Sequence, residues 1–394
     1  MQRALFLVCL VATSLLPQSV EADDLDVFLG RLRIADTQQI SEPYGLDACS
    51  SVESAAATQM APDASRYAPY NSCWFRLMSQ LGMALAGETA SPAHTTAPAS
   101  FYLGFDVSMT SIDSSSYYWR RGTEGDEISS SLGEGENRFV PDVRSWGRLR
   151  MEKGLPFGFS LGGHVAYGFG SSSWGLGASV QFAPFEGFRQ GVGYAPDLAF
   201  RGGMTTMVTG SDFNLTVPTV DIILSKPFVM SGGLVLTPII SGRIAWIIAD
   251  SEVVDLTPGT AAGAECVPRT PYPCNTDPSL GPACRSNDIC HQQSNSCRPP
   301  DGTFGCTGDV SDFANNVVFE PIRTVRAQLN LGVQARFQRF VMRASFGYDL
   351  VAPETPRRQG SGAQGDAPTA DMAADGWDSL ERQWTLNLGL GFGY

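Results

Sequence analysis

The sequence predicts an all-β protein: a transmembrane, antiparallel, up-and-down β-barrel of about ten strands (range about 8–12) with a short N-terminal helical segment. Three observations lead to this prediction. Apolar residues alternate with glycine, small polar residues or arginine along ten runs, and a period of two is typical of a strand with two different faces. The runs last about ten residues or more, as a tilted membrane-crossing strand requires. Only 17 % of the residues are charged, against roughly a quarter in soluble domains.

The ten runs follow one another from Ser100 to the end of the chain. They are Phe101–Thr110, Val143–Met151, Phe157–Phe169, Trp174–Phe182, Leu198–Thr209, Phe213–Leu224, Leu234–Ala249, Val325–Phe337, Phe340–Leu350 and Trp384–Tyr394. The most apolar of them, Leu234–Ala249, contains Pro238, Gly242 and Arg243, and it is shorter than the roughly 20 residues of a membrane-spanning helix. A strand fits this segment better than a helix.

Three of the nine connections between the runs, near residues 112–142, 251–316 and 351–383, are much longer than the others. In an outer-membrane barrel the short turns face the periplasm and the longer loops face outward. An even number of strands then places both ends of the barrel on the periplasmic side, and every long connection falls outside. Trp119, Trp174, Trp246 and Trp384 are expected at the outer rim, where interfacial aromatic residues gather.

Three segments precede or interrupt this pattern. Residues 1–22 resemble a cleaved signal peptide, with a basic start at Arg3, an apolar run and small or aliphatic residues before Asp23. Residues 23–98 do not alternate and contain a helix near 74–86; the segment either plugs the barrel or lies in the periplasm. Residues 99–394 form the barrel, with a Cys-rich extracellular loop at 251–316.

Eight cysteines remain once Cys9 is removed with the signal peptide. An even number of cysteines in an exported chain predicts disulfide bonds rather than a metal site. The eight are Cys49, Cys73, Cys266, Cys274, Cys284, Cys290, Cys297 and Cys306. The last six allow 15 pairings, and the sequence does not choose among them. No Cys-x-x-Cys pair is present, so we expect no metal and no cofactor.

The final strand, TLNLGLGFGY, resembles the closing strand of bacterial outer-membrane β-barrel proteins. Leu388, Leu390, Phe392 and Tyr394 lie on its apolar face, and the resemblance implies that they form the assembly signal. It further implies a porin-like protein of the outer membrane of a Gram-negative bacterium, in contact with lipid and with the barrel assembly machinery. No closer subfamily is recognised.

Charged residues on the non-apolar face of the strands are expected in the lumen, because a charge facing lipid at mid-depth costs about 2–4 kcal/mol. These candidate lumen residues are Arg144, Arg148, Arg150, Arg201, Arg243, Arg326, Arg336, Arg343, Asp106, Asp349 and His164. Two interpretations remain open. The arginines either pair with acidic groups of the loops or plug, or they line open water and attract small anionic solutes.

The residues that could take part in catalysis favour a protein without enzymatic activity. Only three histidines are present, and Ser160, four residues from His164 on the same strand face, is about 13 Å away, too far to be its catalytic partner. The net charge of −13 and the absence of a basic tract exclude nucleic-acid binding. We therefore expect a small porin-like channel with an Arg-lined lumen. The alternative is a non-conducting surface or structural barrel whose disulfide-bonded loop binds a partner, and a barrel hydrolase is the third possibility.

Overall fold

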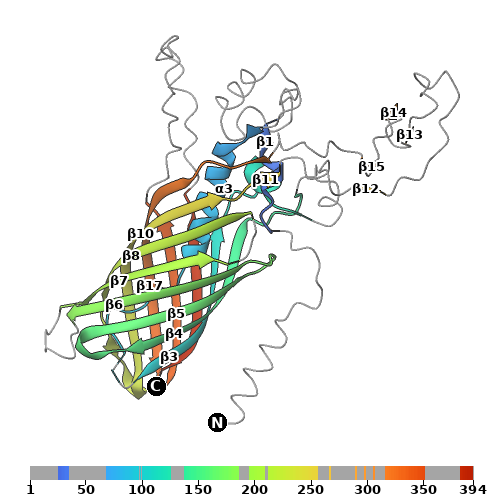
Figure 1. Cartoon of the computed structure of the whole chain (residues 1–394). Helices are drawn as coiled ribbons and strands as arrows, with labels where there is room; N and C mark the ends of the chain where they lie inside the picture. Colours follow the sequence, from blue (N-terminus) through green and yellow to red (C-terminus); the bar gives the residue numbers. More distant parts are fainter. Residues whose placement is uncertain are drawn as a thin grey trace, which may run out of the picture.

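The chain forms a closed antiparallel barrel of ten long strands around a central helix (Figure 1). The computed structural model describes residues 25–34, 68–96, 98, 100–125, 137–185, 195–208, 212–255, 266–267, 289–290, 297–298, 305–306, 316–350 and 382–393. The barrel strands are β3 (Phe101–Ser111), β4 (Val143–Gly154), β5 (Phe159–Gly168), β6 (Trp174–Phe185), β7 (Asp197–Met207), β8 (Phe213–Ser225), β10 (Leu234–Ser251), β17 (Ile322–Phe337), β18 (Phe340–Asp349) and β19 (Trp384–Gly393). All ten predicted runs are confirmed as strands.

Each barrel strand pairs with the next one along the chain, and the last pairs with the first. The 16 residue pairs between β10 and β17 close the wall across the longest loop. The pairing of β19 with β3, from Gly393↔Tyr102 to Thr385↔Thr110, joins the two ends of the barrel. The predicted up-and-down topology is therefore confirmed, and the wall has no open edge through which another segment could enter.

The two ends of the barrel differ in the length of their connections. At one end, which we call the turn end, short segments join β4 to β5, β6 to β7, β8 to β10 and β17 to β18, and β3 begins there. At the opposite end, the loop end, the connections include residues 112–142, 252–321 and 350–383. The prediction that all the long connections fall at one end is confirmed.

The outer face of the wall is apolar and the inner face is polar. Phe105, Leu149, Ile222 and Leu390 are 42–56 % exposed, whereas polar side chains of the inner face, such as those of Arg148, Arg243 and Gln334, are buried. Such a surface, aliphatic and aromatic around the whole wall, belongs in lipid rather than in water. None of the helices among the described residues is both long and apolar enough to cross a membrane.

Three of the four tryptophans predicted for the outer rim lie on the outer face. Trp174, Trp246 and Trp384 are 37–47 % exposed. The prediction was wrong for Trp119, which belongs to the short helix α4 (Tyr117–Arg121) and is fully buried. Its indole N–H donates a 2.6 Å hydrogen bond to Gln80 of the N-terminal helix. Trp119 therefore belongs to the connection between β3 and β4 and points inward instead of lying in the rim.

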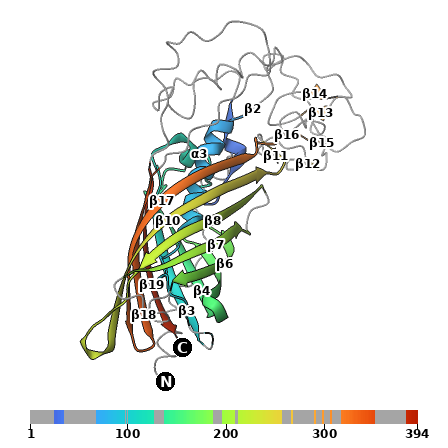
Figure 2. The same cartoon turned by 90° about the vertical axis from the view of Figure 1, so that its left-hand side faces the viewer.

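A helix, α3 (Asn71–Ala86), occupies the lumen (Figures 1 and 2). It contacts strands from around the whole wall, among them β3, β4, β8, β10 and β17. Thirteen of its 16 residues are buried, including Ser79 and Gln80, which is expected for a helix enclosed on all sides. We call residues 71–96, which comprise α3 and the segment after it, the plug.

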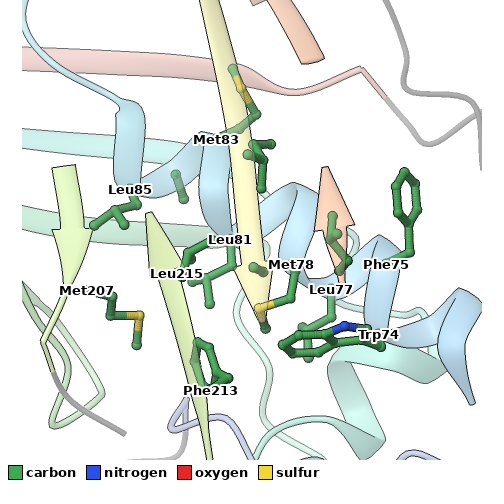
Figure 3. Packing of buried hydrophobic residues seen from close by; sticks show 14 of the residues in the cluster. Trp74, Phe75, Leu77, Met78, Leu81, Met83, Leu85, Met207, Phe213 and Leu215 are labelled. Atoms are coloured by element: carbon green, nitrogen blue, oxygen red, sulfur yellow. The ribbon is translucent and has the colours of Figure 1, made fainter. Parts of the chain in front are cut away.

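The half of the plug nearer the loop end packs against the wall through apolar contacts. Figure 3 shows side chains of α3 beside Phe213 and Leu215 of β8. The ring of Trp74 lies edge-on to that of Phe213, with 5.9 Å between centroids. Gly82 faces β10 so closely that an added Cβ would lie 2.8 Å from Cγ2 of Ile247. A glycine at this position therefore lets the helix backbone approach the wall.

The chain before the plug lies at the loop end. The short helix η1 (Leu29–Arg31) packs there, and β1 (Arg33–Ile34) pairs with β2 (Ala68–Pro69) just before α3 begins. Below α3, Lys153 at the turn end donates hydrogen bonds to the carbonyls of Pro98 and Ser100, immediately before β3. The polypeptide thus runs down the whole lumen, from the loop end to the turn end.

The segment between β10 and β17 contains three nested pairs of short antiparallel strands. β11 (Val254–Asp255) pairs with β16 (Asn316–Val317), β12 (Cys266–Val267) with β15 (Gly305–Cys306), and β13 (Ile289–Cys290) with β14 (Cys297–Arg298). Cys73 is disulfide-bonded. Residues 1–22, Cys49, Cys274, Cys284 and Tyr394 lie outside the described residues.

The register of these pairings predicts the disulfide connectivity of the loop. Cys266 stands opposite Cys306, and Cys290 stands opposite Cys297. Directly opposed residues on antiparallel strands have Cα atoms about 4.5–5.5 Å apart, within the range of a disulfide. We expect peptide mapping of unreduced protein to find Cys266–Cys306 and Cys290–Cys297, with Cys274–Cys284 as the remaining bond. Any other connectivity among the six would contradict this prediction.

Candidate functional site

The candidate site is the lumen, where the predicted charged residues meet the plug. Ten of the eleven candidates are buried inside the barrel: Arg144, Arg148, Arg150, Arg201, Arg243, Arg326, Arg343, Asp106, Asp349 and His164. The eleventh, Arg336, lies near the turn end with its side chain exposed, and its Nε donates to the carbonyl of Gln338 at 3.2 Å. Burial in a closed wall means that each inner charge needs a partner within the barrel.

Two arginines hold the C-terminal end of α3. Arg148 donates to the carbonyls of Ala84 and Leu85, at 3.2 and 2.8 Å, and Arg243 donates to that of Ala86 at 2.7 Å. The carbonyls in the last turn of a helix lack the usual donor four residues further on. That of Ala84 also accepts from the N–H of Gly87, which follows the helix, at 3.3 Å. The negative end of the helix dipole also favours positive charge here. The wall therefore caps the helix that fills it.

Below the helix, Glu88 of the plug joins three wall residues. One carboxylate oxygen contacts the guanidinium of Arg201 and lies 4.0 Å from Arg243. The other lies 3.2 Å from Nδ1 of His164. Glu88 is the acidic group that the plug contributes to this cluster, and it binds groups from β5, β7 and β10. This single side chain therefore connects the plug to opposite parts of the wall.

Arg243 has a second acidic partner on the neighbouring strand. Its Nε and Nη2 donate to the two carboxylate oxygens of Asp221 on β8, at 2.6 and 3.1 Å. This two-point geometry is the strongest arrangement available to a guanidinium and a carboxylate. With Ala86 of the plug bound by Nη1, the guanidinium of Arg243 is directed at the wall and the plug rather than at open water.

A second charged cluster lies nearer the turn end, around Ser91 of the plug. Arg150 forms an ion pair with Glu152 at 2.6 Å and donates to the hydroxyl of Ser91 at 2.7 Å. Asp106 lies 3.7 Å from Arg150. Arg343 donates to Ser91 at 3.2 Å and lies 3.6 Å from Glu152. The pairing of arginines with acidic groups, one of the two interpretations left open by the sequence, is what these contacts support.

The remaining arginines bind at the loop end of the lumen. Arg326 contacts Asp349 on the neighbouring strand and donates to Ser79 of α3 at 3.0 Å. Arg144 donates to the carbonyl of Phe169 at 3.2 Å and to the hydroxyl of Ser171. The guanidinium of Arg144 also lies 5.3 Å from the ring of Trp146, a cation–π contact.

His164 takes part in a hydroxyl–imidazole–carboxylate line. Its Nε2 lies 3.3 Å from the hydroxyl of Thr205, and its Nδ1 faces Glu88. A nucleophilic site uses the same order of groups. Here, however, the line is enclosed by the plug, Arg201 binds the other carboxylate oxygen, and neither His164 nor Thr205 lines the cavity described below. The arrangement therefore fits a structural role.

A cavity of about 520 Å³ lies under the plug at the turn end. Its lining includes Tyr102, Glu152, Thr237, Arg336 and Arg343. The cavity does not continue through the lumen, because the two charged clusters and α3 lie above it. Within the described part of the chain, no group of three or more His, Cys, Asp or Glu residues is arranged to hold a metal ion.

Sequence reasoning missed four residues of these clusters. Glu88 and Ser91 belong to a segment without periodicity, and nothing in the sequence places that segment in the lumen. Glu152 stands at the end of its strand, where alternation is hard to follow. Asp221 did carry a signal, because it is in phase with Phe213, Leu215 and Val217. The alternation assigned no face to this strand, and the apolar set faces α3.

Removal of the Glu88 charge tests the connection between plug and wall. We expect Glu88→Gln to lower the melting temperature, because the positive charge of Arg201 then loses its carboxylate contact with the plug, and breaking a buried ion pair costs about 3–5 kcal/mol. Arg336→Gln is the matched control, since Arg336 is exposed and bonds only to a nearby carbonyl among the contacts found. Melting of Glu88→Gln at the temperature of the parent protein would show that the contact contributes nothing.

Comparison with known proteins gives distant likeness only. No protein-family model matches the sequence, and no curated protein does. Among solved structures, Ail, the attachment invasion locus protein of Yersinia pestis, is 9 % identical; the match covers 75 % of this chain and 98 % of that one, with a TM-score of 0.21 for its complex with the heparin analogue sucrose octasulfate. An anion-selective porin from Comamonas acidovorans is 10 % identical, covering 76 % and 100 %, with a TM-score of 0.15.

Assignment to a class therefore depends on the barrel itself. Ten paired strands close without an edge, their outer face is apolar, and their inner face carries the charged residues. In a membrane these features satisfy every backbone group of the strands and keep charges away from lipid. These features identify the chain as a transmembrane β-barrel.

Proposed function

We propose that the protein is a non-conducting surface barrel whose loop end meets a binding partner. The observation that carries this proposal is the plug, which fills the lumen from Trp74 to Ser91 with contacts to all sides of the wall. A barrel of this size has little interior space beyond its own side chains, and wide aqueous pores need about 16 strands. With a helix inside, the barrel serves as an anchor for what it presents at its ends.

The arginine pattern gives less support to the porin-like alternative. An anion pathway needs guanidinium groups that face water. Arg148, Arg201 and Arg243 instead bind the plug backbone, Glu88 and Asp221. The exposed Arg336 belongs to the cavity at the turn end, which the plug separates from the loop end.

The loop end carries the long connections that could form a binding surface for a partner. Outer-membrane barrels have short periplasmic turns and longer extracellular loops, so we assign the loop end to the cell exterior. The long connections are found there, among them the Cys-rich segment with its nested strand pairs. Disulfide-bonded loops are typical of exposed regions that lack a core of their own.

The charge at this end indicates the chemistry of the partner. Residues 23–70, 112–142, 208–212, 252–321 and 350–383 together contain 31 acidic and 12 basic residues, a net of −19, against −13 for the whole chain. Complementary charge steers association and excludes like-charged partners. A cationic partner fits this end. An anionic one, such as the sulfated sugar bound by Ail, does not.

Planar-bilayer recording of the purified protein tests the closed state. We expect no steady current from the full protein, because the plug leaves no continuous water path. A variant that lacks residues 25–96 but keeps the signal peptide is the control, since removing the plug from an intact wall opens a lumen lined with arginine. Stable, anion-selective channels from the full protein would overturn the proposal and restore the porin-like function.

A further inference from the structure

The N-terminal segment is fixed to the loop end by several contacts. The backbone N–H of Leu25 donates to the carbonyl of Gly170, between β5 and β6, at 2.9 Å. The carboxylate of Asp26 accepts hydrogen bonds from the backbone and the hydroxyl of Ser172, at 2.9 and 2.6 Å. Leu25 and Asp26 therefore lie against a connection at the end of the barrel opposite to the start of β3.

A second set of contacts joins the same segment to the loop between β3 and β4. Val27 forms a β-bridge with Thr123. The guanidinium of Arg31 is 3 % exposed and donates to the carbonyls of Thr123 and Glu124, at 3.1 and 2.9 Å. Leu29 and Leu32 are fully buried in the same apolar cluster as Trp74 and Trp119. The segment is thus part of a cap over the loop end.

Only the lumen connects this cap to the start of the barrel. Ordered contacts mark the path: Trp74 donates to the carbonyl of Glu320 at the loop end, Arg148 binds Leu85 midway, and Ser225 at the turn end accepts from the N–H of Ala93. The closed wall of paired strands leaves no sideways route. Sixteen helical residues span about 24 Å, close to the apolar height of about 25 Å of an outer-membrane barrel.

We propose that the barrel displays its own N-terminal segment, of which residues 25–34 and 68–70 are described at the loop end, on the cell surface, and that this segment reaches the surface through the lumen. The inference rests on the proposed function, because it takes the loop end as the outer one. A chain released from the signal peptide begins in the periplasm, and β3 also begins at the periplasmic end. The segment between them must therefore pass through the lumen before or while the wall closes. The barrel is then both the conduit and the anchor of the segment that it presents.

Epitope insertion tests the position of the segment. One epitope is inserted per variant: after Gly45 in the N-terminal segment, after Gly362 between β18 and β19, or after Gly187 between β6 and β7. Antibody binding is measured on intact and on permeabilised cells. We expect the Gly45 and Gly362 variants to bind antibody on intact cells, and the Gly187 variant to bind only after permeabilisation.

The three variants separate failure of the inference from failure of the proposed function. Surface binding at Gly362 with none at Gly45 overturns the display of the N-terminal segment and leaves the orientation of the barrel intact. Surface binding at Gly187 with none at Gly362 reverses the orientation, which overturns the proposed function and the inference with it.

Trypsin treatment of intact cells carrying the unmodified protein provides a readout that does not depend on insertions. Arg33 and Arg66 flank residues 34–66, whereas Arg189 lies between β6 and β7. We expect mass spectrometry after reduction to find the peptide 34–66 and no cleavage at Arg189. Absence of that peptide, together with cleavage within residues 350–383, would overturn the inference.

Discussion

Buried arginines inside a closed wall are the constraint on which the structure depends. A lumen narrow enough for one helix cannot hydrate several guanidinium groups, so each must find an oxygen atom within the barrel. The plug supplies many of these atoms, and acidic residues of the wall and the connection between β5 and β6 supply the others. The carbonyls of residues 84–86 and 89, the carboxylate of Glu88 and the hydroxyl of Ser91 all accept from arginines of the wall. Wall and plug therefore stabilise each other, because neither satisfies its polar groups alone.

The plug also explains why the inner face changes character along the barrel. Toward the loop end, β8 turns Phe213, Leu215 and Val217 inward, where they pack on α3. Toward the turn end, the same face of the same strand carries Asp221, which pairs with Arg243. The apolar part matches the apolar surface of the helix, and the charged part matches the end of the helix and the extended segment after it. Along the barrel axis, the residues of the inner face thus match the polarity of the part of the plug that they contact.

Periodicity predicted most of the fold. Ten strands, their order and the division into short and long connections follow from alternation, because lipid outside and polar groups inside impose a strict period of two. The position of residues 71–96 did not follow, since a helix buried on all sides has no distinctive face and fits a periplasmic site equally well. The partners of the arginines were missed for the same reason. Glu88 and Ser91 can be assigned to the lumen only once the plug is known to lie there. Trp119 is buried instead of lying in the rim, and it donates a hydrogen bond to Gln80.

Amide hydrogen exchange of α3 tests the central claim, that the plug is held inside the barrel by its contacts with the wall. A 16-residue helix is marginal in water by itself, so an α3 in an open, water-filled lumen would exchange quickly. The mutual stabilisation of plug and wall predicts that amides of residues 75–86 in the detergent-solubilised protein exchange as slowly as those of β10. Exchange of α3 at the rate of an unstructured peptide, while β10 remains protected, would contradict it.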